Sequence, residues 1–436
     1  MQTHLSPEFQ GTPDGEQAEA ILRKCVHCGF CNATCPTYQL LGDELDGPRG
    51  RIYLIKQLLE GGEVTRSTQQ HLDRCLTCRN CESTCPSGVE YGHLADIGRR
   101  LVEQRVPRPA GERVVRWLLK EGLTSSMFAP ALRVGRALSS VLPQSLKSKV
   151  QPPADAPIRG IPSREHGRKV LLPAGCVQPA MRPNIDGATR RVLDAAGIQA
   201  VTAGGADAAG GADGAAAAKS GCCGAIRQHL SDHDGALADM RRNVDAWWPL
   251  VESGAVEAIV VNASGCSVMV KDYGHALARD PAYAARAARI SALTRDLCEL
   301  LPDLAPALAS RVHPERAGKI AVHSPCTLQH GQQIRGAVEI HLQALGFEVA
   351  GACAEAHLCC GSAGTYSVLQ PELAGRLRDR KLENLGALGA GCIVSANIGC
   401  IQHLQSGCAT PVRHWVEIVD DALADGLDNG PAGSPA

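Results

Sequence analysis

Residues 24–38 read KCVHCGFCNATCPTY, and residues 74–88 repeat the pattern as RCLTCRNCESTCPSG. Each stretch contains four cysteines at the spacing C-x2-C-x2-C-x3-C, and proline follows the fourth cysteine. Thiolates are preferred ligands of iron–sulfur clusters, and this spacing is the one that bacterial two-cluster ferredoxins use. The doubled motif therefore predicts two [4Fe–4S] clusters.

The fourth cysteine of each motif is expected to serve the cluster of the other motif. Two-residue gaps let one loop wrap around three corners of a cluster, and the fourth cysteine then lies too far around to reach the same one. One predicted ligand set is Cys25, Cys28, Cys31 and Cys85. The other predicted set is Cys75, Cys78, Cys81 and Cys35. Zinc is the alternative metal, although it usually takes two separated pairs of ligands.

The composition narrows the class of protein. The chain has 436 residues with a net charge of -1 and 3% aromatic residues, which allows two or three domains and gives no sign of nucleic-acid binding. Its start, MQTHLSPEFQGTPDGEQ, has no apolar signal-peptide core. We therefore expect a cytoplasmic protein whose 20 cysteines bind metal rather than form disulfides. No apolar run reaches membrane-spanning length, so any contact with a membrane would be peripheral.

The N-terminal domain is expected to span residues 1–105 and to be α-helical. Apolar residues at helical spacing predict a helix over 49–60 with Ile52, Ile55 and Leu58 facing inward. A second helix is predicted over 67–74. This domain would consist of helices around two clusters, unlike a small β-rich ferredoxin.

A basic linker is expected over residues 106–166. Residues 99–169 contain fifteen Lys or Arg and five Asp or Glu, and amphipathic helices are predicted over 111–123 and 128–142. Such helices suit a membrane surface or a partner groove, or they pack as a linker on their own protein. The linker ends in a proline-rich stretch that is typical of a hinge.

From residue 167 onward the chain alternates strands and helices, and the order occurs twice. Strands are predicted to end at Cys176, Cys266, Cys326 and Cys400, with further strands over 198–203 and 347–352. Helices are predicted over 184–197, 234–253, 332–346 and 371–388. This repeat indicates an internal duplication, with α/β units over 167–310 and 311–427 before a disordered tail over 428–436. A low-complexity segment over 203–221 is expected to be a flexible insertion.

Each α/β unit contains a Cys-Cys-Gly sequence and two further cysteines at matching places. The matching cysteines are Cys176, Cys222, Cys223 and Cys266 in the first unit and Cys326, Cys359, Cys360 and Cys400 in the second. Because open parallel sheets bind ligands at the carboxyl ends of their strands, these eight cysteines are candidates for a further metal or cluster site. Zinc, a regulatory thiol or a remnant of the duplication are the alternatives.

Other cysteines and histidines receive a structural interpretation. Cys298, Cys353, Cys392 and Cys408 are expected to be core residues. His323, His357 and His403 lie beside the cysteine set in the sequence, and we expect loop histidines with satisfied hydrogen bonds rather than ligands. No flavin motif, P-loop or nucleophile elbow occurs, so no catalytic residue is predicted.

The doubled cluster motif followed by two Cys-Cys-Gly (CCG) units resembles the iron–sulfur subunits of respiratory flavoprotein dehydrogenases and the heterodisulfide-reductase-like proteins. The stretches that carry the resemblance include 25–61, HLDRCLTCRNCESTCPSGVEYGHLADIGR, HLCCGSAGTYSVLQPELAGRLRDRKLENL and SANIGCIQHL. Within this group the chain is similar to glycolate oxidase iron–sulfur subunits. The resemblance implies an α+β multi-domain fold, with an α-helical two-cluster ferredoxin domain followed by two duplicated α/β CCG units.

The resemblance also implies a function. FAD-binding partner subunits would oxidise glycolate to glyoxylate, and this chain would pass the electrons to a respiratory acceptor such as quinone, at the cytoplasmic face of the inner membrane. One alternative is an equivalent subunit for D-lactate, glycerol 3-phosphate or a heterodisulfide. A further alternative is a zinc-stabilised scaffold. Relatives of the heterodisulfide type carry C-x-x-C after the paired cysteines. Here Met269 and His403 take the place of the last cysteine, which argues against a non-cubane cluster.

Overall fold

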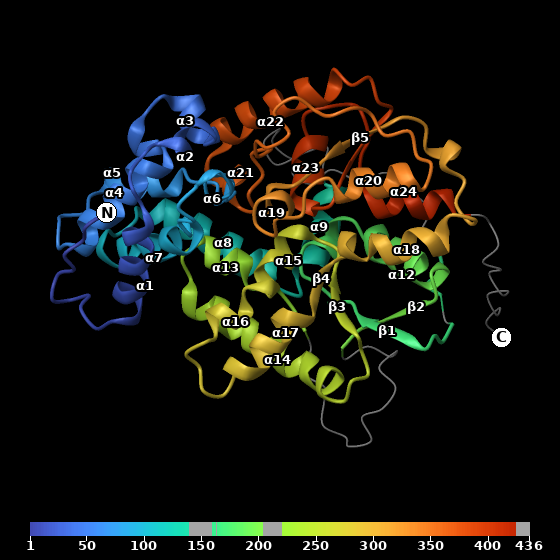
Figure 1. Ribbon diagram of the computed structural model, residues 1–436, viewed down its shortest axis with the longest axis horizontal. Coiled ribbons are helices and arrows are strands. Elements are labelled where there is room, and N and C mark those ends of the chain that lie inside the picture. The colour runs from blue at the N-terminus through green and yellow to red at the C-terminus, as the bar shows by residue number, and fades with distance from the viewer. Residues whose placement is uncertain (139–158, 163, 204–219, 424–436) are drawn as a thin grey trace.

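The computed structural model of the chain describes residues 1–138, 159–162, 164–203 and 220–423. Its N-terminal region is α-helical, as predicted, and lies at one end of the molecule (Figure 1). The elements are α1 (Pro13–Lys24), α2 (Phe30–Ala33), α3 (Pro36–Leu41), the short 3₁₀ helix η1 (Glu44–Asp46), α4 (Pro48–Leu59), α5 (Arg66–Asp73), α6 (Asn80–Thr84) and α7 (Tyr91–Arg105). The helices predicted over 49–60 and 67–74 are confirmed as α4 and α5. Ile52, Ile55 and Leu58 are buried, also as predicted.

Two helices follow, α8 (Ala110–Thr124) and α9 (Phe128–Ala137), and α8 has its polar side turned toward the protein. Glu112, Arg116 and Lys120 recur every four residues on one face of α8. Arg116 pairs with Asp73 at 3.1 Å, and Lys120 pairs with Asp232 at 3.1 Å. The charged face therefore packs inward, and no residue of α8 is buried.

The first α/β unit is built on a four-stranded parallel sheet in the order β2-β1-β3-β4. Its strands are β1 (Arg168–Leu171), β2 (Ile198–Val201), β3 (Ala258–Val261) and β4 (Thr294–Asp296). Its helices are α11 (Gln178–Met181), α12 (Asn184–Ala195), α13 (Ala225–His229), α14 (His233–Glu252), α15 (Ser264–Lys271), α16 (Tyr273–Ala276) and α17 (Ala284–Leu293), then η2 (Leu297–Leu300), α18 (Leu301–Leu308) and η3 (Pro314–Ala317). The predicted helices over 184–197 and 234–253 are confirmed as α12 and α14.

The second unit has a three-stranded parallel sheet in the order β5-β6-β7. Its elements are β5 (Ile320–His323), α19 (Cys326–Gln329), α20 (Ala337–Ala344), α21 (Tyr366–Leu369), α22 (Pro371–Gly386), β6 (Cys392–Ser395), α23 (Ile398–Gln405), β7 (Val412–His414) and α24 (Trp415–Ala422). The fold class is therefore confirmed: a helical N-terminal region precedes two α/β units with parallel sheets.

Several predicted boundaries are wrong. The strands end before the cysteines: β3 ends at Val261 and β6 at Ser395, so that Cys266 and Cys400 lie on helices α15 and α23. In the same way β1 and β5 end at Leu171 and His323, ahead of Cys176 and Cys326. The physical reason is that short parallel strands give way to a turn at the sheet edge, and the following helix begins there.

The second unit also differs from prediction next to β5. The strand predicted over 347–352 is reduced to a single parallel bridge between Ile320 and Val349, because the segment leaves the sheet after one contact. The helix predicted over 332–346 is shortened to α20, which begins after Gly336 in the left-handed conformation (φ 68°). The predicted tail over 428–436, most of the 203–221 insertion, most of the proline-rich hinge and the end of the 128–142 helix lie outside the described residues.

The duplication extends further than predicted. Strand β4 leads into η2 through a capping box of Asp296 and Glu299, and β7 leads into α24 through a capping box of His414 and Glu417. In each case the side chain of the strand's last residue accepts a backbone hydrogen bond, and the glutamate three residues later accepts one from the backbone N–H of that last residue. Both units therefore end in the same strand and capped-helix element.

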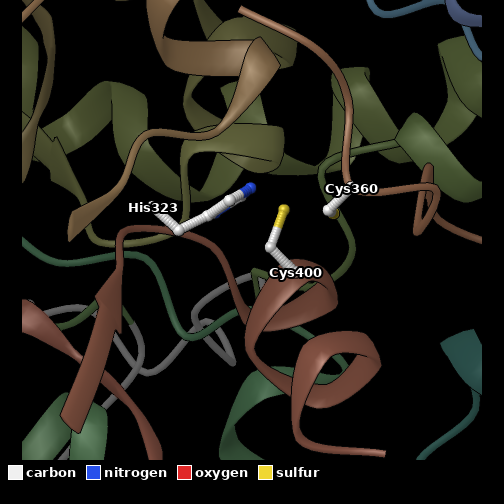
Figure 2. Close-up of side chains that lie close together, drawn as sticks. All are labelled: His323, Cys360 and Cys400. Atoms are coloured by element: carbon white, nitrogen blue, oxygen red, sulfur yellow. The ribbon is translucent and has the colours of Figure 1, made fainter. Parts of the chain in front are cut away.

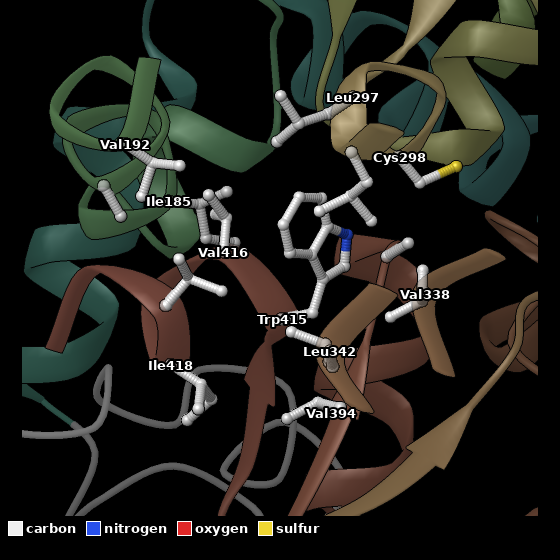
Figure 3. Close-up of a cluster of buried hydrophobic side chains, with 14 of the residues drawn as sticks. Ile185, Val192, Leu297, Cys298, Val338, Leu342, Val394, Trp415, Val416 and Ile418 are labelled. Carbon is white, nitrogen blue, oxygen red and sulfur yellow. The ribbon is translucent and has the colours of Figure 1, made fainter. Parts of the chain in front are cut away.

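The two α/β units share one hydrophobic core. Trp415 is fully buried between Leu297 of the first unit and Leu342 of the second (Figure 3). Helices α12 and α24 pack together, and Arg191 pairs with Asp420 across them at 2.7 Å. The units therefore form one packed body rather than two independent domains. Among the described helices, none has both the length and the apolar character needed to cross a membrane.

Substitution Trp415→Ala is expected to destabilise both units together. Removing a fully buried indole leaves a cavity in the shared core and costs about 3–5 kcal/mol. Chemical denaturation of the anaerobic protein, combined with limited proteolysis of each unit, measures this effect. Trp117→Ala is the control, because that side chain is 58% exposed. If the first unit kept its resistance to proteolysis in Trp415→Ala, the units would not depend on a common core.

Candidate functional site

The structure brings the eight cysteines of the doubled motif together around two adjoining cavities. Cys25, Cys28, Cys31 and Cys85 line the first cavity. Cys35, Cys75, Cys78 and Cys81 line the second, and Cys81 also reaches the wall of the first. The fourth cysteine of each motif thus faces the cavity of the other motif. All twenty cysteines of the chain are free thiols.

The backbone of the two cysteine loops has the same unusual conformation. His27 and Gly29 have positive φ angles of 58° and 87°, and Thr77 and Arg79 at the matching positions have 53° and 60°. Left-handed residues curl a loop so that successive N–H groups turn toward its inside, which suits an anionic group. Three of these four residues are not glycine, and non-glycine residues keep such angles only where the surrounding structure holds them.

The chemistry of the thiols fits a metal cluster. Burial, followed by the nearby Cys25 thiol, raises the pKa of Cys31 to about 11. Burial also raises the pKa values of Cys78 and Cys81 well above the usual range, and neighbouring thiols add to the effect. Thiolates so crowded would repel one another, whereas a bound metal replaces their protons and neutralises their charge. The donor set therefore suits thiolate-ligated iron.

The second cavity has cationic neighbours. Arg51, 1% exposed, lines it and donates to the His71 carbonyl (2.7 Å) and to Thr37 Oγ1 (3.1 Å). Arg99 donates to Thr77 Oγ1 at 2.8 Å and to the Cys75 carbonyl. Burial raises the pKa of Cys75, but the charges of Arg51 and Arg99 outweigh it and hold that pKa below the ordinary value. The cysteine motifs did not predict that either arginine belongs to the site, because both arginines lie outside the cysteine loops.

The first cavity lies closer to the surface than the second. Cys28 is exposed, and two apolar side chains on its loop, Val26 and Phe30, are 68% and 62% exposed. Arg49 lines this cavity, but its guanidinium pairs with Glu44. The two cavities therefore differ in exposure.

The eight CCG cysteines fall into two groups, one in each unit. In the first, Cys222 contacts Cys176 and Cys223, and Cys223 contacts Cys266. In the second, Cys326 Sγ lies 3.7 Å from Cys359 Sγ, and Cys360 contacts both Cys359 and Cys400. Each unit thus forms one chain of four thiols, as the duplicated pattern predicts. Of the cysteines expected in the core, Cys298 and Cys392 are buried and Cys353 and Cys408 are partly buried.

The thiols of the second unit adjoin the second cavity. Cys326 is close enough to Cys78 to raise its pKa, and both pack in a small apolar cluster with Leu76, Cys359 and Tyr366.

Three hydrogen bonds support this junction. Tyr366 donates to the Arg74 carbonyl at 3.2 Å, Asn80 donates to the His357 carbonyl at 3.3 Å, and His330 Nδ1 lies 3.0 Å from Ser83 Oγ. The helical N-terminal region is therefore fixed onto the second unit at its cysteine set.

The predicted histidines have different surroundings. Nε2 of His403 bonds the Ala374 carbonyl at 3.1 Å, as expected for a structural histidine. His323, however, is buried with Cys360 and Cys400, and their ligand atoms all lie within 4.8 Å of one another. Burial lowers the pKa of His323 to about 3, so its imidazole is neutral. The sequence predicted an ordinary loop histidine at His323. It did not predict this group, because the three residues are far apart along the chain and only the fold brings them together.

This arrangement defines a class of protein: an iron–sulfur protein with a two-cluster ferredoxin region joined to a duplicated cysteine-rich domain. Residues 21–89 match the family described as "4Fe-4S dicluster domain". Residues 207–271 and 320–405 match the family described as "Cysteine-rich domain".

Comparison with known proteins shows the particular family. The chain is 50% identical over 428 residues to the "Glycolate oxidase iron-sulfur subunit" of Escherichia coli (strain K12), covering 97% of this chain and 99% of that protein. It is 28% identical to the "Probable glycolate oxidase iron-sulfur subunit" of Bacillus subtilis (strain 168), with 89% of each chain covered. "Lactate utilization protein A" of Geobacillus thermodenitrificans is 27% identical over 46% of this chain and 82% of its own length. The chain belongs to the family of glycolate oxidase iron–sulfur subunits, and the resemblance seen in the sequence is confirmed.

Substitution Arg99→Gln is expected to lower the reduction potential of a cluster bound in the second cavity by tens of millivolts. A nearby cation favours the more negative, reduced form, so removing its charge makes reduction harder. Redox titration followed by electron paramagnetic resonance measures the shift. Arg99→Lys keeps the charge and is expected to retain most of the potential. An equal shift in both variants would mean that the hydrogen bonds of Arg99, not its charge, set the potential.

Proposed function

We propose that this chain is the electron-transfer subunit of a flavin-dependent glycolate oxidase (glycolate dehydrogenase). Partner subunits that bind FAD would oxidise glycolate to glyoxylate. The observation that carries the proposal is the placement of the two predicted four-cysteine sets around separate, adjoining cavities, in a chain similar over nearly its full length to a glycolate oxidase subunit.

The proposed cofactors are two [4Fe–4S] clusters. Cys25, Cys28, Cys31 and Cys85 would hold one cluster, and Cys75, Cys78, Cys81 and Cys35 the other. When bound, these clusters accept and release single electrons, which suits transfer from a flavin to a respiratory acceptor such as quinone. The protein supplies buried thiols, the curled loop backbone, and the charges of Arg51 and Arg99. FAD is assigned to the partner subunits alone.

The surface around Cys28 is the proposed docking face for the flavin subunit. Val26, Phe30 and Tyr53 are exposed there, and His27 lies 6.4 Å from the Tyr53 ring. Large apolar side chains left in water mark sites of protein association. A partner seated on this face would exclude water from the first cavity and come close to its thiols.

A second candidate is an equivalent subunit that serves lactate. The partial similarity to lactate utilization proteins favours it, although it covers 46% of this chain. Equivalent subunits for glycerol 3-phosphate or a heterodisulfide would transfer electrons from a flavin partner in the same way. Anaerobic flavin bleaching in the purified complex, by glycolate or by D-lactate in turn, separates these candidates.

Peripheral attachment to the cytoplasmic face of the inner membrane is also proposed, through the outer face of α8 and α9. Because the charged side of α8 is paired with the protein, Trp117 and Leu118 are 58% and 55% exposed. Arg113, one turn before Trp117, and Arg133, on α9, are exposed, whereas Glu112 and Glu121 pair with arginines. Exposed tryptophan, aliphatic side chains and cations suit an anionic bilayer surface.

Substitution Cys28→Ser is expected to abolish transfer of electrons to quinone while flavin reduction by glycolate continues. Serine is a poor ligand for iron, so the first cluster is lost or degraded, and iron falls below about eight per chain. Stopped-flow absorbance of the flavin, quinone reduction and iron analysis measure these effects in the whole complex. Cys353→Ser is the matched control, since Cys353 lies outside both cavities. Loss of flavin reduction in Cys28→Ser would contradict the assigned role.

The double substitution Trp117→Ser and Leu118→Ser is expected to weaken binding to phosphatidylglycerol-containing vesicles at least tenfold. Each apolar side chain contributes about 1.5–3 kcal/mol when fully buried, and partial insertion still contributes a large share. Vesicle flotation at low and high salt measures the binding of each protein to the vesicles. Ile340→Ser, which removes a 60% exposed side chain on α20, is the control. Wild-type protein that does not float with anionic vesicles would contradict membrane attachment by this face.

A further inference from the structure

The second α/β unit gathers two kinds of metal ligand at one buried point. Nitrogen and sulfur atoms of His323, Cys360 and Cys400 all lie within 4.8 Å of one another, and all three residues are buried. Figure 2 shows the His323 imidazole and the Cys400 thiol pointing toward each other, with Cys360 alongside. The three side chains come from the end of β5, the CCG turn and helix α23, so the tertiary fold assembles the group.

The spacing of these atoms is close to what a single ion requires. A tetrahedral ion with bonds of about 2.3 Å to sulfur and about 2.0 Å to nitrogen holds its ligand atoms roughly 3.5–3.8 Å apart. Cys359 contacts Cys360, and Cys326 Sγ lies 3.7 Å from Cys359 Sγ, so both thiols lie next to the group without belonging to the set of atoms within 4.8 Å of one another.

The eight ferredoxin cysteines are spaced differently. Within the described chain, no three of them bring their sulfurs within 4.8 Å of one another. This wider spacing is what a four-iron cluster requires, because its ligands bind separate iron corners. The group in the second unit is therefore compact where the two ferredoxin cavities are wide.

The surroundings orient the ligands. Nδ1 of His323 lies 3.0 Å from Ser395 Oγ, which accounts for one ring nitrogen and leaves Nε2 for the thiols. Histidine ligands of metals are held in this way by an outer partner. Asn397 Nδ2 donates to Cys400 Sγ at 3.4 Å, and the Gly361 N–H donates to Cys359 Sγ at 3.4 Å. These donors stabilise sulfur in its thiolate form.

The first unit lacks this arrangement despite the duplication. His323 precedes Cys326 by three residues, and Pro173 holds the matching position before Cys176. Counting back in the same way from Cys400 and Cys266, Ser395 and Asn397 correspond to Val261 and Ala263. The nitrogen ligand, its orienting hydroxyl and the amide donor to sulfur are therefore specific to the second unit.

We propose that the second unit binds one thiophilic divalent ion, zinc or ferrous iron, through His323, Cys360 and Cys400. Three protein ligands leave one position of a tetrahedral ion for a further donor. The ion would tie β5, the CCG turn and α23 together beside Cys78, at the junction with the N-terminal region. The inference does not depend on which substrate the complex oxidises.

The test is metal analysis of the full-length protein purified without oxygen, with acid-labile sulfide measured on the same sample. The expected result is about one zinc or iron per chain in excess of the iron that matches the sulfide. His323→Ala is expected to lose this extra ion and to keep the iron and sulfide of the two clusters. The retained clusters report that the variant has folded.

Two further variants make the test specific. His403→Gln changes a histidine of the same unit that bonds the Ala374 carbonyl, and it is expected to keep the ion. His323→Cys supplies another ligand and is expected to restore binding that His323→Ala loses. The proposal is overturned if the wild type holds no metal beyond its sulfide-matched iron, or if His323→Ala keeps the extra ion.

Discussion

Crowding of buried thiols is the constraint on which this structure depends. Eight cysteines line two adjoining cavities, and burial raises the pKa values of Cys31, Cys78 and Cys81, which disfavours their thiolate forms. A bound cluster takes the place of those protons, so cofactor binding and folding of the loops are linked. The left-handed residues of both loops and the arginines beside the second cavity suit the negative charge that a thiolate-bound cluster would bring.

The contacts around the second cavity also determine how the rest of the chain is arranged. Leu76 and Cys78 pack against Cys359 and Tyr366, so direct side-chain packing holds the helical region against the second α/β unit. The two units in turn share the core around Trp415. The first unit also contacts the helical region, for example where His93 Nε2 lies 3.3 Å from an Asp272 carboxylate oxygen. The second unit differs in that its own thiols, Cys326 and Cys359, lie at the contact with Cys78.

The place of the missing last cysteine in each C-x-x-C does not predict which side chain lies beside the thiols. His403 occupies that place in the second unit, yet its ring bonds the Ala374 carbonyl. Met269, its counterpart, packs at the edge of the first unit's core. His323, far away along the chain, is the histidine that lies beside the thiols. Spacing motifs could not reveal it, because the parallel pairing of β5 with β6 brings the two segments together.

The sequence by itself determined what depends on local spacing: the two four-cysteine motifs, the helices α4, α5, α12 and α14, the duplication and the α+β class. These features follow from short-range covalent geometry and from periodic burial, which a linear pattern records. Only the tertiary structure decided what depends on distant segments. It ended the strands before Cys266 and Cys400, turned the charged side of α8 inward, and placed Arg51 and Arg99 by the second cavity. It also joined His323 to Cys360 and Cys400, because packing of separate elements selects such neighbours and leaves no periodic signal in the sequence.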